Sequence, residues 1–293
     1  MNDQEEYKGA ILVTGSNGQL GKELQRLTSN NQKYQFLYTT KETLPIDNFE
    51  AVRKYFEAQQ VDYCINCAAY TAVDKAETEN EKAYLINATA VANLAQVCKQ
   101  NETLLVHIST DYVFNGSSSI PYKENDAIDP INTYGFSKLK GEELAFINNP
   151  STLIIRTSWV YSSYGNNFVK TMVRLMNERE KINVVNDQYG CPTYAADLAE
   201  VILTIIDQSE TKTLSGILNY CNSGTITWYQ FALAIKEMTK SNCIVKPISS
   251  SEYVTAAKRP HYSVLDTAKI RELLDIDIPY WKDSLERCLT LLG

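Results

Sequence analysis

The chain has 293 residues, of which 44% are hydrophobic and 22% are charged, and its formal net charge is −7. This composition is typical of a globular protein with a large core, and the length favours a main domain with a second lobe. The acidic balance and the lack of a basic cluster argue against a nucleic-acid partner. The two histidines stand in no ligand spacing, so we predict no metal site.

The compartment is indicated by the N-terminal segment and by the cysteines. The segment MNDQEEYKG lacks the apolar core of a secretory signal. No apolar run reaches the roughly 18 residues that a membrane span needs, so we expect no membrane contact. The seven cysteines are an odd number and are scattered along the chain. We therefore expect a cytoplasmic protein with free thiols, and we interpret the C-x-x-C pair Cys64 and Cys67 as core residues.

Apolar runs of strand length alternate with helix-like stretches in the first half. This alternation predicts parallel strands with right-handed crossovers, and thus an α/β, Rossmann-like doubly wound sheet. We place this dinucleotide-binding domain at residues 1–157. The predicted strands are Ala10–Thr14, Tyr34–Tyr38, Tyr63–Cys67, Leu104–Ser109 and Leu153–Arg156. The predicted helices are Gln19–Thr28, Phe49–Gln59, Glu81–Gln100 and Thr133–Ile147. The buried stripe predicted for the third helix is Tyr84, Ala88, Val91, Leu94, Ala95 and Cys98.

The second half is less regular and contains no repeat or Pro-rich linker. We expect residues 158–293 to form mainly a smaller substrate-binding lobe, interleaved with the first domain because segments around 195–221 return to it. Short strands are predicted in INVVNDQYGCPTY and CIVKPIS. The predicted helices are Phe168–Arg179, Asp197–Ile206, Thr227–Thr239 with Thr227 as N-cap, Ile270–Leu274 and Trp281–Leu292.

The stretch ILVTGSNGQLGKEL places Gly15, Gly18 and Gly21 between a predicted strand and a predicted helix. Glycines at such a turn let the backbone approach a pyrophosphate, which then faces the free N–H groups of the helix. The spacing is G-x-x-G-x-x-G rather than G-x-G-x-x-G. Its position after the first strand nevertheless favours dinucleotide binding over a turn that binds nothing.

The end of the second predicted strand bears on the choice of cofactor. NAD-binding folds hold the ribose with an acidic residue there. Here residues 37–41 contain no acid, and Lys41 is close by. We therefore expect NADPH, with NADH as an alternative.

Two further segments carry chemistry. Tyr134 and Lys138 are four residues apart, so on a helix they share one face. An ammonium group beside a phenol should lower the pKa of the tyrosine, which could then exchange a proton with a carbonyl or alcohol oxygen. Ser109, Thr110 and Asp111 end a predicted strand, where a doubly wound sheet binds its ligands.

Taken together, these motifs resemble the extended short-chain dehydrogenase/reductase family, and within it the branch that reduces dTDP-4-dehydrorhamnose. The resemblance runs from near residue 10 to the C-terminus. The segments that carry it are GSNGQLGKEL, NCAAYTAVDKAE, STDYVFNG, YGFSKLKGE, RTSWVY, GNNFVKTM, NDQYGCPTY and KRP.

The resemblance implies a role for each matching position. Thr110 would hydrogen-bond the sugar carbonyl, Tyr134 would protonate it, and Lys138 would hold the nicotinamide ribose. The other implied cofactor contacts are Gly15, Gly18, Gln19, Leu20, Gly21, Ile46, Ala68, Ala69 and Tyr70. The implied contacts to the dTDP-sugar substrate are Val73, Asp74, Thr110, Asp111, Tyr112, Trp159, Asn167, Gln188, Thr193 and Arg259.

The sequence also departs from the family pattern. Pro45 replaces an acid that is common there, which leaves Ile46 to contact the cofactor through its backbone. Some members bridge their dimers with metal-bound glutamates. Glu23 matches one such position, but Ala196 stands at another. A monomer and a homodimer both remain open.

Three alternative functions are compatible with a chain of this fold. The first is another nucleotide-sugar enzyme of this fold, a 4,6-dehydratase or an epimerase; a dehydratase would carry a second acid after Thr110 and Asp111, where this chain has Tyr112. A reductase of another 4-keto nucleotide sugar is harder to separate. The third alternative is a non-catalytic, NADP-binding regulatory subunit, which would not need Thr110, Tyr134 and Lys138.

Overall fold

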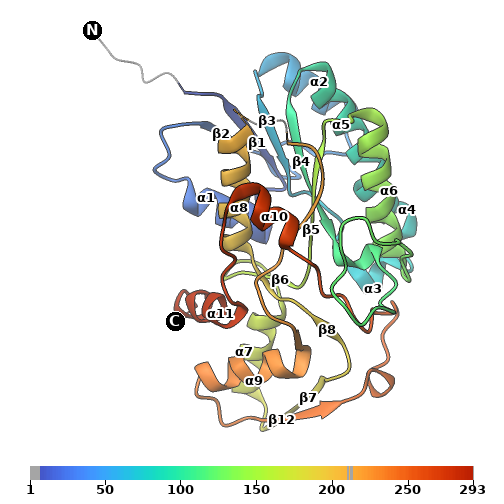
Figure 1. Ribbon diagram of the computed structural model, residues 1–293, viewed down its shortest axis with the longest axis vertical. Coiled ribbons are helices and arrows are strands. Elements are labelled where there is room, and N and C mark those ends of the chain that lie inside the picture. Colours follow the sequence, from blue (N-terminus) through green and yellow to red (C-terminus); the bar gives the residue numbers. More distant parts are fainter. Residues whose placement is uncertain (1–6, 210, 212–213, 293) are drawn as a thin grey trace.

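The computed structural model describes residues 7–209, 211 and 214–292. The predicted domain ranges also include residues 1–6, 210, 212–213 and 293, which lie outside the described residues, as does most of the MNDQEEYKG segment. A sheet with the order β10-β5-β4-β3-β1-β2 occupies the upper half of the molecule in Figure 1, and every pairing in it is parallel. This confirms the doubly wound α/β fold. Its strands are β1 (Ala10–Thr14), β2 (Gln35–Tyr38), β3 (Tyr63–Asn66), β4 (Leu104–Thr110), β5 (Leu153–Thr157) and β10 (Gly216–Asn219).

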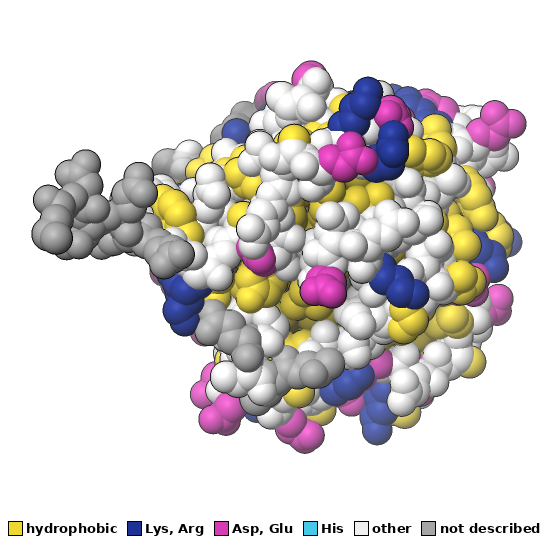
Figure 2. Space-filling model, turned by 90° about the horizontal axis from the view of Figure 1, so that it is seen from above, with side chains coloured by type: hydrophobic (Ala, Val, Ile, Leu, Met, Phe, Trp, Pro, Cys, Tyr) yellow, Lys and Arg dark blue, Asp and Glu magenta, His cyan; other side chains and the backbone are white. Residues whose placement is uncertain are grey.

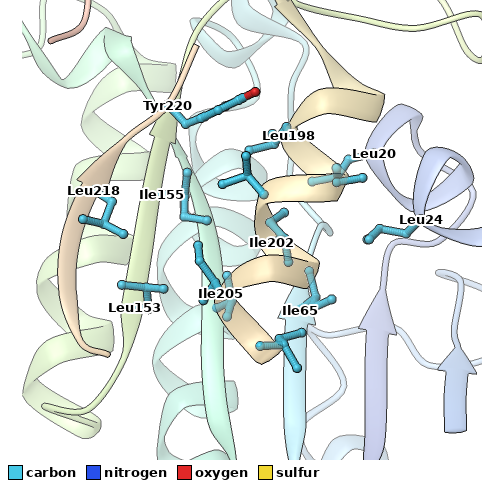
Figure 3. Packing of buried hydrophobic residues seen from close by; sticks show 14 of the residues in the cluster. Leu20, Leu24, Ile65, Leu153, Ile155, Leu198, Ile202, Ile205, Leu218 and Tyr220 are labelled. Carbon is cyan, nitrogen blue, oxygen red and sulfur yellow. The ribbon is translucent and has the colours of Figure 1, made fainter. Parts of the chain in front are cut away.

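Helices cover both faces of this sheet (Figure 1). On one face lie α1 (Gln19–Leu27), α8 (Ala195–Ser209) and α10 (Ala268–Leu274). On the other lie α2 (Phe49–Ala58), α4 (Asn80–Tyr84), α5 (Ala90–Gln100) and α6 (Thr133–Asn148). Figure 3 shows Leu198, Ile202 and Ile205 of α8 packed against side chains of the central strands. The second half of the chain therefore supplies one edge strand, β10, and two covering helices of the sheet, α8 and α10.

The strand order fixes where a ligand can bind. β1 pairs with β2 on one side and with β3 on the other, so the direction of winding reverses between β1 and β3. In doubly wound sheets the binding crevice lies outside the carboxyl ends of the strands at this switch point. Here those ends lead into Gly15 and Cys67.

A smaller lobe lies below the sheet in Figure 1. Its helices are α7 (Phe168–Glu178), α9 (Trp228–Met238) and α11 (Trp281–Thr290). Its paired strands are β6 (Val160–Tyr161) with β9 (Thr193–Tyr194), β7 (Lys181–Val185) with β12 (Ile244–Ile248), and β8 (Tyr189–Gly190) with β11 (Ile226–Thr227). Thr227 is the N-cap of α9, as predicted, and forms a capping box with Gln230.

The predicted helix Glu81–Gln100 is interrupted, and its stripe is wrong at Tyr84. A π-helical turn (η1, Leu85–Thr89) separates α4 from α5. A π-helical turn contains an extra residue, and one extra residue rotates the buried face of the following helix by about 100° relative to the preceding one. Ala88 and the later stripe residues are therefore buried, but on the N-terminal side the buried position is Ala83, and Tyr84 is 39% exposed.

The surface and the cysteines complete the description. Figure 2 shows acidic and basic side chains interspersed on one face of the molecule. Across the described ranges, no helix is both long enough and apolar enough to cross a membrane. All seven cysteines are free. Cys64 is buried in β3, as predicted, whereas Cys67 follows the end of that strand, is half-buried against the core and also lines the cleft described next.

Candidate active site

A cleft of about 850 Å³ lies at the carboxyl ends of the sheet strands. It is lined by residues of both lobes, and fourteen of the predicted site residues contribute to it. These are Gly15, Gly18, Gln19, Leu20, Ile46, Ala68, Ala69, Val73, Thr110, Asp111, Tyr112, Tyr134, Lys138 and Trp159.

The turn after β1 has the shape of a phosphate cradle. Gly15 has a φ of +62°, and a Cβ there would lie 2.6 Å from the Ala68 backbone nitrogen. A Cβ on Gly21 would lie 2.5 Å from the Cα of Ser16, so this glycine lets α1 approach the turn and does not line the cleft. Gly18 is the N-cap of α1 and offers no side-chain acceptor to the first turn. The free N–H groups and the helix dipole therefore suit an anionic pyrophosphate.

The end of the cleft beside β2 contains the residues that would meet the adenosine half of a dinucleotide. Lys41 is exposed and lines this end together with Pro45 and Ile46. The Thr40 hydroxyl donates a hydrogen bond of 2.7 Å to Glu42 Oε2, and this bond lowers the pKa of the Glu42 carboxyl. An exposed cation at this position suits the additional phosphate of NADPH.

Thr110 and Asp111 are placed by the end of β4. Both are buried, and the Thr110 hydroxyl accepts from the Tyr112 amide and donates to Asp111 Oδ1 at 3.0 Å. Asp111 Oδ2 is buried without a hydrogen-bond partner. Burial raises the pKa of Asp111 to about 7, although the Ser263 and Thr110 hydroxyls act in the opposite direction.

Tyr134 and Lys138 lie on α6 and line the same cleft. The Tyr134 ring is half-buried and packs edge-on against Tyr112, with ring centroids 5.8 Å apart. Burial raises the pKa of Tyr134 to about 12, so the expected lowering by Lys138 is wrong for this structure. The reason is that the Lys138 amine contacts other partners: it lies 2.6 Å from the Ile108 carbonyl oxygen and 3.2 Å from His107 Nε2. We call Thr110, Asp111, Tyr134 and Lys138 the catalytic wall.

The opposite wall is aromatic. Trp159 has a φ of +47°, which is uncommon for a residue other than glycine and strained for a bulky side chain. Its ring stacks on Trp228 with centroids 3.5 Å apart, and Phe168 lies 4.6 Å from Trp228. All three line the cleft. We call Trp159, Phe168 and Trp228 the aromatic wall.

Hydrogen bonds join the two lobes beside the cradle. Asn167 caps α7 with its Oδ1, while its Nδ2 donates to Gln19 Oε1 at 2.8 Å. The buried Glu23 carboxylate accepts a 2.6 Å hydrogen bond from the Ser162 hydroxyl and pairs with Arg26. Glu23 therefore has partners within the chain, and the described residues contain no cluster of three His, Cys, Asp or Glu that could hold a metal. Asn167 itself does not line the cleft.

Asp74 and Arg259 pair with each other. Two guanidinium nitrogens of Arg259 donate to the two carboxylate oxygens at 2.7 and 3.1 Å. This hydrogen bonding lowers the pKa of Asp74. The pair links α3 (Val73–Ala76) to the C-terminal segment, outside the residues that line the cleft. The predicted substrate contacts of both residues remain predictions.

Three other predicted residues also lie outside the cleft lining. Tyr70 is buried, and its backbone is held by Asn87. Thr193 is fully buried and accepts from Thr157, which does line the cleft. Gln188 donates to Ser250. Their roles toward ligands remain predictions.

Sequence reasoning missed several residues that shape the site. Trp228 begins a helix of the smaller lobe, and no local sequence pattern indicated that its side chain lines the cleft. Asn87 sits in the π-helical turn and also donates to Ser137 of α6. Glu142 holds Ser109 and Arg156 in a buried group, and His107 contacts Lys138. The inward position of Asn87 depends on the π-helical turn, which was not predicted.

Fold and cleft are together those of the short-chain dehydrogenase/reductase class of dinucleotide-binding proteins. The family model described as RmlD substrate binding domain matches residues 9–293. The chain therefore belongs to this family.

Its relatives cover nearly the whole chain. A dTDP-4-dehydrorhamnose reductase of Aggregatibacter actinomycetemcomitans is 39% identical over 94% of this chain and 97% of its own. Spore coat polysaccharide biosynthesis protein SpsK of Bacillus subtilis is 40% identical over 95% and 96%. The crystal structure of dTDP-4-dehydrorhamnose reductase from Bacillus anthracis in complex with NADP is similar with a TM-score of 0.92, at 41% identity over 97% of this chain and 99% of the other.

Proposed function

We propose that this protein is an NADPH-dependent reductase that converts the C4 ketone of dTDP-4-dehydro-L-rhamnose into the alcohol of dTDP-L-rhamnose. The observation that carries the proposal is the placement of Thr110 and Tyr134 in one cleft with the glycine cradle. Relatives with near-complete coverage are named for this activity, and one of them was crystallised with NADP. The free cysteines are compatible with a cytoplasmic site of action, which we also propose.

The residues present fit the cofactor. Gly15 and the first turn of α1 would hold the pyrophosphate, Lys41 the adenosine end, and Lys138 the nicotinamide ribose. NADPH, when bound, supplies the hydride. The protein must then orient the ketone, stabilise its oxygen and provide a proton.

Tyr134 is suited to provide that proton. Its pKa of about 12 keeps the phenol protonated at neutral pH, which is the form that a reduction consumes. The Thr110 hydroxyl lies at the same end of the cleft, and by turning its one proton away from Asp111 Oδ1 it can donate a second hydrogen bond to the oxygen on which negative charge develops. Asp111 Oδ2 can accept from a sugar hydroxyl, and the aromatic wall can pack against an apolar ring face.

The test is an assay of the purified protein with NADPH or NADH and dTDP-4-dehydro-L-rhamnose. We expect NADPH consumption and dTDP-L-rhamnose as product, with lower turnover on NADH. Turnover only of a different 4-keto nucleotide sugar would favour the second reductase alternative. NADPH binding without turnover of any such sugar would contradict the proposal and favour a regulatory subunit.

A further inference from the structure

A buried row of polar side chains crosses the sheet beneath the catalytic wall. Thr14 of β1 donates through its hydroxyl to Asn66 Oδ1 at 2.6 Å. Asn66 Nδ2 of β3 lies 3.0 Å from His107 Nδ1 of β4, and His107 Nε2 lies 3.2 Å from Lys138 Nζ of α6. Thr14, Asn66, His107 and Lys138 are each at most 1% exposed. Four buried polar groups on neighbouring elements are thus joined end to end.

The direction of these bonds fixes the state of the imidazole. The Thr14 hydroxyl uses its one proton on Asn66 Oδ1, so the amide presents an N–H to His107 Nδ1. Burial and the nearby Lys138 hold the pKa of His107 well below its ordinary value, so the ring is neutral. A neutral ring that accepts at Nδ1 carries its proton on Nε2. His107 therefore presents an N–H toward Lys138 in this arrangement.

Such a donor matches an uncharged amine. Neutral Lys138 can accept from Nε2–H with its lone pair, donate one proton to the Ile108 carbonyl and keep the other for the cleft. A charged ammonium has no lone pair and requires the other tautomer, with the proton on Nδ1 and the Asn66 amide turned over. The neutral pair carries three N–H protons, one on the His107 ring and two on the Lys138 amine. The charged pair carries four, one on the ring and three on the ammonium, so the pair gains one proton in all.

We propose that His107 is a positioning residue of the proposed reductase, which holds the Lys138 amine at the floor of the cleft and changes tautomer when that amine gains or loses a proton. The inference rests on the proposed function, because the position matters through what Lys138 does there. It explains why a histidine with no access to solvent or ligand lies behind the catalytic wall.

The surroundings of Lys138 set the pH at which its amine changes charge and the His107 tautomer changes with it. Burial lowers the pKa of Lys138 to about 8, and the charge of Glu142 acts in the opposite direction. Glu142 is itself paired with Arg156. The other titratable groups that line the cleft near Lys138 are Cys67, Asp111, Tyr112 and Tyr134. With this lowered pKa, Lys138 changes charge near pH 8. The burial-raised pKa values keep Cys67, Tyr112 and Tyr134 protonated there, whereas Asp111, with a pKa of about 7, titrates below the Lys138 midpoint.

The direct test is nitrogen NMR of the imidazole rings, since the chain has only two histidines. His261→Gln assigns the signals. Between about pH 6 and about pH 10 we expect His107 to remain neutral and to pass from the Nδ1–H to the Nε2–H tautomer, with its midpoint where Lys138 titrates. In Lys138→Met the tautomer should not depend on pH. One unchanging tautomer in the wild type, or a change that survives in Lys138→Met, would overturn the inference.

A kinetic test adds a second readout. In His107→Gln the new side chain can turn its oxygen toward the ammonium, so we expect the pH dependence of kcat attributed to Lys138 to move upward by about half a unit or more. His107→Asn is the second variant if His107→Gln does not fold. An active variant with an unshifted profile would show that His107 only fills the core. Absence of wild-type turnover would instead count against the proposed function, and the NMR test would still decide the inference.

Discussion

The two walls of the cleft are built by different means. The catalytic wall stands on β4 and α6, where strand register and buried hydrogen bonds fix each group: Thr110 is bonded to Asp111, and Lys138 to the Ile108 carbonyl. The aromatic wall stands on the smaller lobe, where the stack of Trp159 on Trp228 sets the surface. The first wall can therefore hold reacting atoms closely, whereas the second offers area for packing. Substitutions should separate these two contributions.

The largest effect is expected at Tyr134. Tyr134→Phe removes the proton donor while keeping the ring that packs on Tyr112. We expect kcat to fall by about 10²–10⁴-fold, with NADPH affinity and the free energy of unfolding nearly unchanged. Turnover, cofactor titration and urea unfolding measure the three quantities. Near-full activity would show that the catalytic wall is not where the proton is supplied.

The burial of Asp111 should make the free energy of unfolding depend on pH. Its pKa in the folded state, about 7, lies above the unfolded value of about 3.9, so the folded state binds more protons between these limits. The free energy of unfolding should therefore fall as pH rises through that window. Asp111→Asn should flatten this dependence and gain up to about 4 kcal/mol relative to wild type by pH 8, with no gain at pH 4. A wild-type profile that is already flat would contradict the burial of a proton at this site.

Trp228→Ala should affect binding more than chemistry. Losing a half-buried ring that stacks on Trp159 should lower the free energy of unfolding by about 2 kcal/mol and raise KM for the sugar nucleotide, with kcat largely kept. The control is Leu233→Ala, on the same helix but 37% exposed. A loss confined to kcat would mean that the aromatic wall takes part in the chemistry.

The smallest effect is expected where the lobes meet. Asn167→Ser keeps an oxygen to cap α7 but loses the amide that donates to Gln19. In a double-mutant cycle with Gln19→Ala we expect a coupling energy of about 1 kcal/mol, from thermal or urea unfolding. Additive effects of the two substitutions would indicate that the lobes are held by other contacts, such as Ser162 with Glu23.

The same contrast explains what could be predicted from the sequence. β1 begins and ends where the apolar run does, and Thr227 caps its helix, because both signals are local. Thr110 was found at the end of a predicted strand, Tyr134 and Lys138 were found by their spacing on one helix face, and the family resemblance supplied their expected roles. Tyr84 was misplaced because a π-helical turn leaves no trace in periodicity. Trp228 and the pairing of Asp74 with Arg259 depend on how distant segments pack, which spacing along the chain does not encode.

The most direct test of the central claim follows a deuterium label. Wild-type protein would be given NADPH deuterated at the transferred position, together with dTDP-4-dehydro-L-rhamnose, and compared with Tyr134→Phe at equal cofactor occupancy. We predict dTDP-L-rhamnose carrying deuterium at C4 from the wild type, and little product from the variant. Label-free product, or equal product from both proteins, would contradict reduction at the catalytic wall.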